Sequence, residues 1–238
     1  MMGADLLAQD WSQALLPLWV SLKLAAVTTL CLLLLGTPLG YWLARDSRHS
    51  ALRRLKIMLM GVIALPLILP PTVLGFYLLL LMSPNFGIGR WLAAHQIPSL
   101  AFSFTGLVIG SIVYSLPFFV QPVYAQFARV PRSTFEVASL LEPRWYRRFW
   151  VAILPQARIG MLLGSLVSFA HTIGEFGVVL MIGGSIAGET KVVSIAIYEQ
   201  VEALNYANAH LLSGLLIVLA LLLLALITTV SRYLPRPS

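Results

Sequence analysis

The sequence is dominated by long apolar runs that are almost free of charge. Hydrophobic residues make up 59% of the 238 positions and charged residues 11%, compared with about 25% in soluble domains. A helix of about 20 apolar residues crosses the hydrocarbon core of a bilayer. These runs exclude a soluble enzyme, a disordered chain and a disulfide scaffold, and they predict an all-α polytopic membrane protein. Five spans are expected, at roughly 18–43, 57–82, 102–126, 159–182 and 210–231.

The basic residues predict the orientation of these spans. Thirteen of the 16 lysines and arginines, with only three acids, fall between spans one and two, between spans three and four, and in the tail. The N-terminus and the other two loops carry mostly acids. Because basic loops stay on the cytoplasmic side, we expect the N-terminus outside and the C-terminus inside. The net charge of +7 is therefore a feature of topology and does not indicate a nucleic-acid partner. Residues 1–238 are expected to form a single transmembrane domain.

Span two contains the run LPLILPPTVLG at 65–75, which holds three prolines within six residues. Each proline lacks a backbone donor and clashes with the preceding turn, so the helix must kink or break there. Freed backbone groups are tolerated in a membrane only against protein or a water-filled cavity. The break is either a packed kink or part of a transport path that includes Pro70, Pro71 and Thr72.

Span four contains FAHTIGEFG at 169–177, which would place His171 and Glu175 four residues apart on one helical face. A charged side chain inside a span is costly and must be paired, protonated or exposed to water. Lys23 is the only other charged residue within a span, at a similar depth, so we hypothesise an ion pair between Lys23 and Glu175 within one chain or across a dimer. The alternative is that Lys23 reaches the membrane surface and Glu175 is hydrogen-bonded by backbone.

The segment at about 129–158 between spans three and four is amphipathic. Ser133 followed by Glu136 has the pattern of a capping box, and Pro143 would end the short helix that follows. Such a helix needs a partner, or the membrane surface, to cover its apolar face. The run RWYRRFWVAILP at 144–155 suits an interfacial helix.

This segment resembles a known family. Glu136-Val137-Ala138, followed by Ile153-Leu154-Pro155, is similar to the "EAA" loop of permease subunits in binding-protein-dependent ABC importers. The family usually has glycine at the position of Glu142, so the turn that ends the helix must be built differently here. The resemblance implies a coupling helix that docks on an ATPase subunit, formed by Ser133, Thr134, Phe135, Glu136, Val137, Ala138, Ser139, Leu140, Leu141 and Glu142.

Three further motifs resemble the ModB-type molybdate/tungstate permease subunits: LPLILPPTVLG at 65–75, SFAHTIGEFG at 168–177 and GETKVVSIAIY at 188–198. The resemblance covers roughly residues 18–230. It implies a type I ABC importer permease fold, a homodimer in the bacterial inner membrane, two copies of a cytoplasmic ATPase and a periplasmic oxyanion-binding protein. The chain has no G-x-x-x-x-G-K-[ST] loop, so ATP and Mg²⁺ are expected on the partner ATPase, with no enzyme activity, cofactor or metal site in this chain.

A tetrahedral dianion in the path needs hydrogen-bond donors that also release it. The candidates are Thr72, Ser168, His171 and Thr172. Two alternatives belong to other classes. One is an ion-coupled secondary anion transporter with Glu175 as a proton relay. The other is a structural membrane subunit without a path of its own, which the prolines and Glu175 disfavour.

Overall fold

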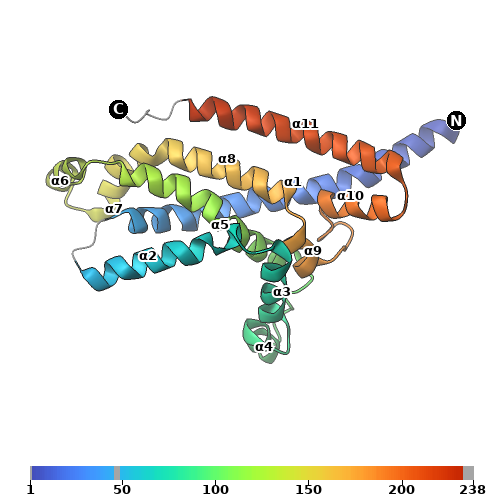
Figure 1. The fold of residues 1–238 in the computed structure, drawn as a ribbon, viewed down its shortest axis with the longest axis horizontal. Coiled ribbons are helices and arrows are strands. Elements are labelled where there is room, and N and C mark those ends of the chain that lie inside the picture. Colours follow the sequence, from blue (N-terminus) through green and yellow to red (C-terminus); the bar gives the residue numbers. More distant parts are fainter. Residues whose placement is uncertain (1, 46–48, 233–238) are drawn as a thin grey trace.

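The computed structural model describes residues 2–45 and 49–232, and within these ranges every regular element is a helix (Figure 1). The first half contains α1 (Met2–Ala44), α2 (Ser50–Ala64), the 3₁₀ turn η1 (Leu65–Leu67), α3 (Pro71–Met82), α4 (Gly87–Ala94) and α5 (Phe104–Ala128). The second half contains α6 (Arg132–Leu141), α7 (Trp145–Arg148), the short segments η2 (Phe149–Ile153) and η3 (Leu154–Ala157), α8 (Arg158–Gly174), α9 (Gly177–Gly183), α10 (Val193–Glu202) and α11 (Tyr206–Ser231).

Among the described residues, five helical stretches are long and apolar enough to cross a membrane: Leu15–Ala44, Pro71–Ala94, Phe104–Ala128, Trp145–Gly174 and Tyr206–Ser231. The predicted all-α polytopic class with five spans is confirmed. The first, third and fifth spans agree with the predicted ranges to within a few residues.

The predicted bounds of spans two and four were wrong because each run is broken. In span two, α2 ends at Ala64 and α3 starts at Pro71, with Pro66 in the intervening turn. The ring of Pro71 is tolerated at the first position of α3, where no intrahelical donor is needed. In span four, α8 ends at Gly174 and a separate short helix, α9, follows. The sequence analysis predicted that the helix of span two would kink or break at its prolines, and the structure shows a complete break between α2 and α3.

The centre of the fold is a bundle of α1, α5 and α8, each of which contacts the other two. Phe119 of α5 is fully buried at this centre. A Cβ atom added at Gly36 of α1 would lie 2.5 Å from the Phe119 ring, and one added at Gly164 of α8 would lie 2.9 Å from the Phe119 carbonyl oxygen. Small residues let helix backbones approach closely where the surroundings are as apolar as the side chains.

Helix α2 is joined to the end of α1 by Lys56, which is only 8% exposed. Its ammonium donates hydrogen bonds to the carbonyl oxygens of Trp42 and Arg45, at 2.5 and 2.6 Å. Carbonyls in the last turn of a helix lack intrahelical partners, and a cation placed there also complements the helix dipole. Lys56, which the sequence analysis counted among the basic residues of the loop between spans one and two, is therefore buried and connects α1 with α2.

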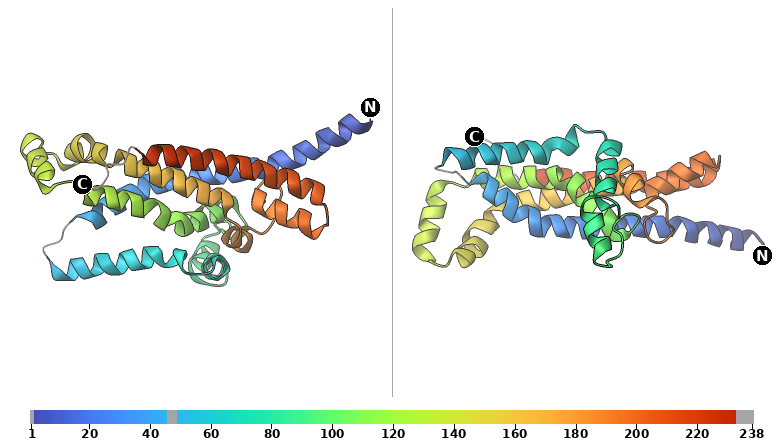
Figure 2. Two further views of the ribbon diagram at one scale, coloured as in Figure 1. Left: turned by 45° about the horizontal axis from the view of Figure 1, so that its top comes forward. Right: turned by 90° about the horizontal axis from the view of Figure 1, so that it is seen from below.

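Two features of the arrangement matter for the site. First, α3 and α4 lie across the long axis of the bundle instead of along it, as Figure 1 and the right view of Figure 2 show. Second, the end of α1, the start of α2, α6 and the end of α11 point toward one end of the bundle, and the start of α1 points toward the other. The segments with most of the basic residues thus share one end.

We predict that Gly164→Val destabilises the protein, because the added side chain would clash with the backbone of α5. Overpacking of this kind costs about 1–3 kcal/mol, which corresponds to a fall in melting temperature of about 5 °C. The measurement is thermal unfolding of the purified protein in detergent. Gly214→Val in α11 is the matched control, since an added Cβ there meets no atom within 4 Å. Equal melting temperatures for the two variants would contradict the packing of α5 against α8.

Candidate translocation site and coupling helix

Glu175 lies in the break between α8 and α9. Its backbone is extended, with φ −69° and ψ 134°, and its N–H donates to the Thr172 carbonyl at 3.4 Å. Because α8 ends one residue earlier, the prediction that His171 and Glu175 share a helical face was wrong. The chain leaves α8 at Gly174 and enters α9 at Gly177, so only Glu175 and Phe176 lie between the two helices.

Glu175 connects three elements although it is only 4% exposed. Its Oε2 accepts a hydrogen bond from the Ser111 hydroxyl of α5 at 3.1 Å, and its backbone carbonyl accepts one from the Ser194 hydroxyl of α10 at 2.6 Å. The other carboxylate oxygen, Oε1, has no hydrogen-bond partner among the described residues. A buried polar atom without a partner is uncommon and indicates a site where a further group binds or the chain moves.

A second polar group lies one turn away from Glu175. His171 Nδ1 is 3.0 Å from the Ser115 hydroxyl, which is also 3.0 Å from the Thr172 hydroxyl. The imidazole ring stacks on Phe118, with ring centroids 3.9 Å apart, and lies 4.8 Å from the ring of Tyr114. The ring is therefore held between α5 and α8 in one orientation.

A cavity of about 540 Å³ opens where α3, α5 and the α8–α9 break meet. Four of the seven predicted path residues line it: Pro71, Thr72, His171 and Glu175. The other three do not. Pro70 is exposed beside the cavity, and Ser168 and Thr172 are buried inside the bundle, where the Thr172 hydroxyl donates to the Ser168 carbonyl at 2.9 Å.

The wall of the cavity depends on a close contact between α3 and α9. A Cβ atom added at Gly177 would lie 2.7 Å from Cβ of Pro71, and one added at Gly75 would lie 2.8 Å from Cβ of Met181. The two halves of the broken spans therefore pack on each other through glycine. Sequence motifs 100 residues apart, LPLILPPTVLG and SFAHTIGEFG, meet at this contact.

Sequence reasoning placed no residue of α5 among the path candidates, whereas the structure brings four to the site: Ser111, Tyr114, Ser115 and Phe118. Their signal was the spacing of three and four residues, which places them on one helical face.

The structure does not form the predicted ion pair between Lys23 and Glu175 within one chain. Both residues are described, and no salt bridge joins them; instead the Lys23 ammonium lies over the Phe104 ring, 4.5 Å from its centroid. Glu175 uses the Ser111 hydroxyl instead of a cation. The version of the hypothesis that places the pair across a dimer stays a prediction.

Helix α6 lies at the end of the bundle near the end of α1 and the start of α2 (Figure 1). It covers the predicted segment 133–142 with each end displaced by one residue. Val137 and Leu140 are 54% and 84% exposed, whereas Ala138 is 6% exposed and faces the rest of the chain. The side chains of Phe135 and Leu141 lie outside the part that the structure describes. An exposed apolar strip on a short helix is a surface that a partner or a membrane can cover.

The predicted capping box was wrong. The helix begins at Arg132 with Pro131 in the N-cap position, and no side chain caps it. Ser133 is therefore inside the first turn and cannot serve as the N-cap. Proline has a fixed φ that suits the entry to a helix, and with Pro131 as the N-cap the helix begins two residues earlier than the Ser133–Glu136 pattern indicated.

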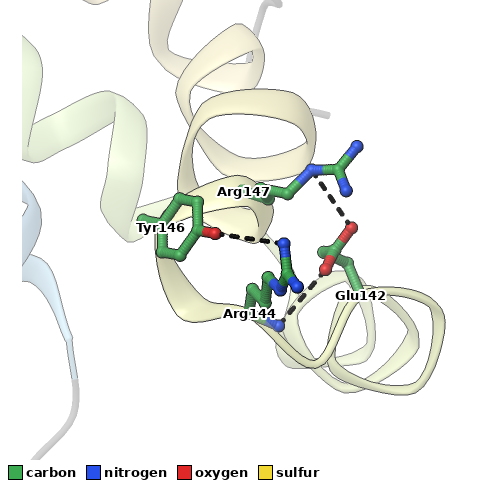
Figure 3. A network of polar contacts seen from close by, with 4 residues as sticks. All are labelled: Glu142, Arg144, Tyr146 and Arg147. Atoms are coloured by element: carbon green, nitrogen blue, oxygen red, sulfur yellow. Dashed lines mark hydrogen bonds and ion pairs between the residues drawn. The ribbon is translucent and has the colours of Figure 1, made fainter.

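The end of α6 is built by Glu142, as Figure 3 shows. Glu142 has an extended backbone, and its carboxylate accepts the Arg144 backbone N–H at 3.3 Å and lies 3.5 Å from Nε of Arg147. The Arg144 guanidinium donates to the Tyr146 hydroxyl at 3.4 Å. The expectation that this turn is built differently from a glycine turn is confirmed: Glu142 ends the helix in an extended conformation, and its carboxylate contacts the two arginines that follow.

Two solved structures share this fold. A chain of the MetNI methionine ABC transporter in an inward-facing conformation matches with a TM-score of 0.68, covering 95% of this chain and 98% of that one, at 14% identity. A chain of a bacterial alginate ABC transporter in complex with its periplasmic protein matches with a TM-score of 0.71, covering 92% and 78%, also at 14% identity. At this identity the likeness shows the fold alone, which is that of type I ABC importer permeases.

The relatives found by sequence identify the family within this fold. The molybdenum transport system permease protein ModB of Azotobacter vinelandii is 44% identical over 90% of this chain and 92% of its own length, and ModB of Haemophilus influenzae is 32% identical over 77% and 78%. A sulfate transport system permease protein, CysW, of Synechocystis is 32% identical over 89% and 74%. Residues 36–236 match the family described as "Binding-protein-dependent transport system inner membrane component". The chain belongs to this family, as a ModB-type ABC importer permease.

Proposed function

We propose that two copies of this chain form the translocation path for molybdate or tungstate in an ATP-driven importer of the bacterial cytoplasmic membrane. The observation that carries this proposal is the 44% identity, over 90% of the chain, to a molybdenum transport permease. Sulfate permeases are also relatives, and molybdate, tungstate and sulfate are all tetrahedral dianions. The proposed substrate class is therefore a tetrahedral oxyanion, with molybdate or tungstate as the preferred members.

In this proposal, the end of the bundle that carries α6 faces the cytoplasm. A separate ATPase subunit binds ATP and Mg²⁺, and each α6 rests on one ATPase through Val137 and Leu140. The exposure of these two side chains supports the docking role, because burying an apolar side chain stabilises an interface by about 25 cal/mol per Å². Closure of the ATPase pair would move both α6 helices together and change access to the path.

A periplasmic binding protein would deliver the oxyanion at the other end of the bundle. The segments there carry Glu189, Glu199 and Glu202, and the N-terminal segment adds Asp5 and Asp10. An acidic surface repels a free dianion, so delivery by an enclosing protein is physically consistent.

The cavity at the helix breaks is the proposed part of the path within each chain. Thr72 and His171 offer donors to an oxyanion there, and Tyr114 offers a third. Hydrogen bonds from neutral groups are weaker than charge pairs, which allows an importer to release its substrate. Glu175 has a positioning role, because its contacts with Ser111 and Ser194 hold α5, the break and α10 together.

We predict that Leu140→Asp separates the permease from its ATPase. An aspartate in the apolar contact would cost about 2 kcal/mol, which is about thirtyfold in affinity. The measurement is the amount of ATPase that co-purifies with the permease. Ala51→Asp is the control, since it adds the same charge at an exposed site of α2 at the same end. Full retention of the ATPase by Leu140→Asp would contradict the docking role of α6.

We predict that Thr72→Val slows molybdate uptake about tenfold, because a hydrogen bond from its hydroxyl to the anion would be worth about 1–1.5 kcal/mol. Uptake is measured in vesicles containing the complete transporter, at equal protein content. Thr229→Val is the matched control: its hydroxyl is on exposed α11 and donates to the Ala225 carbonyl of its own helix. Unchanged uptake by Thr72→Val would remove Thr72 from the path.

The function itself is tested by uptake in vesicles that contain this chain, its ATPase and the binding protein. We expect uptake of molybdate that requires ATP and is inhibited by tungstate more strongly than by sulfate or phosphate. Uptake driven by a proton gradient without the ATPase would support the secondary carrier instead. Equal inhibition by sulfate would assign the chain to a broader oxyanion importer.

A further inference from the structure

A second cavity, separate from the helix breaks, lies at the end of the bundle opposite α6. It measures about 250 Å³, close to the lower limit of about 300 Å³ for small-ligand pockets. Its walls come from the start of α1, the segment before α10, α10 itself and the first turns of α11. Leu16, Pro17 and Leu212 form its apolar side, and Lys191, Gln200 and Asn208 form its polar side.

The polar side of this cavity has unused hydrogen-bonding capacity. The side chains of Gln200 and Asn208 are half-buried, and neither carboxamide has a hydrogen-bond partner within residues 2–45 and 49–232. Lys191 forms an ion pair with Glu199 and is 26% exposed. An ammonium has three donors, so the contact with Glu199 leaves donors of Lys191 available to the cavity it lines.

Glu199 stays ionised beside Lys191. Partial burial raises its pKa, but hydrogen bonds from Lys191 and Ser185 and the charge of Lys191 outweigh this and lower the pKa of Glu199 below its ordinary value. Lys191 therefore brings one positive charge to the lining of the cavity, and the ionised Glu199 lies directly behind it as its ion-pair partner.

Aromatic residues place the cavity at the membrane–water interface. Trp19, Tyr198 and Tyr206 are 63%, 43% and 56% exposed, and each is within three residues of a lining residue on the same helix. Tryptophan and tyrosine with exposed rings are enriched at the level of the lipid headgroups. Beyond the cavity, α11 exposes a continuous apolar surface that includes Ile217, Val218 and Leu221.

We propose that this cavity binds the headgroup of a zwitterionic phospholipid, a phosphate ester that carries a primary amine, as in phosphatidylethanolamine. The phosphate accepts hydrogen bonds from Lys191, Gln200 and Asn208, and the amine of the headgroup faces Glu199. The acyl chains lie along the exposed surface of α11. The bound lipid would fix α10 and α11 against α1 on the side where the substrate enters.

The test is native mass spectrometry of the full-length protein in detergent with added phosphatidylethanolamine or phosphatidylglycerol. We expect phosphatidylethanolamine to be retained better than phosphatidylglycerol, which lacks the amine. The double variant Lys191→Gln with Asn208→Leu should retain phosphatidylethanolamine about tenfold less, or about 1.4 kcal/mol. Arg90→Gln, which removes an exposed charge on α4 away from the cavity, is the control and should bind like the wild type.

Four results would overturn the proposal. The first is equal retention of lipid by the double variant and the control. The second is equal binding of the two lipids by the wild type, and the third is displacement of the lipid by an equal concentration of soluble glycerophosphoethanolamine, which would assign the site to a free phosphate ester. If the double variant fails to fold, retention of lipid is compared instead between Gln200→Leu, provided that its melting temperature is unchanged, and the Arg90→Gln control. A variant that keeps its lipid but loses stimulation of ATP hydrolysis by the binding protein would assign the cavity to protein docking and also overturn the lipid site.

Discussion

Backbone groups inside a bilayer must find partners within the protein, and this constraint governs the whole structure. Two of the five apolar runs are interrupted, one by prolines at 65–71 and one at Glu175 between two glycines. Neither break stands alone, because α3 packs on α9 through Gly75 and Gly177, beside the cavity that Pro71 and Glu175 line. At the breaks, hydroxyl, imidazole and carboxylate groups from α3, α5, α8 and the residue after α8 line a common space.

The same arrangement links the two ends of the molecule. Helix α8 starts from η2 and η3, which follow α6 and α7, and it ends at the break that holds Glu175. A displacement of α6 can therefore act on the cavity through one helix of 17 residues packed against α5. The contact of Glu142 with Arg144 and Arg147 gives the turn between α6 and α7 a defined shape, which a lever of this kind requires.

Much of this fold could be predicted from the sequence, because apolar length and proline position are strong local signals. The five spans, the break near Pro70 and the turn without glycine at Glu142 follow from them. Two of the predictions that failed depended on tertiary contacts, and a third on a neighbouring proline. The break at Glu175 is stabilised by Ser111 and Ser194 on other helices, and Lys23 finds the Phe104 ring instead of an acid. Ser133 has the pattern of a cap, but Pro131 determines where α6 begins.

The central claim is that the cavity at the two breaks is part of the substrate path. It is tested most directly by the labelling rate of Thr72→Cys with a membrane-impermeant thiol reagent, in a background where the single cysteine, Cys31, is replaced by serine. The account predicts that the rate differs between the resting transporter and the ATP-bound complex with its binding protein, and that molybdate slows it. A rate that is the same in both states and indifferent to molybdate would contradict the account.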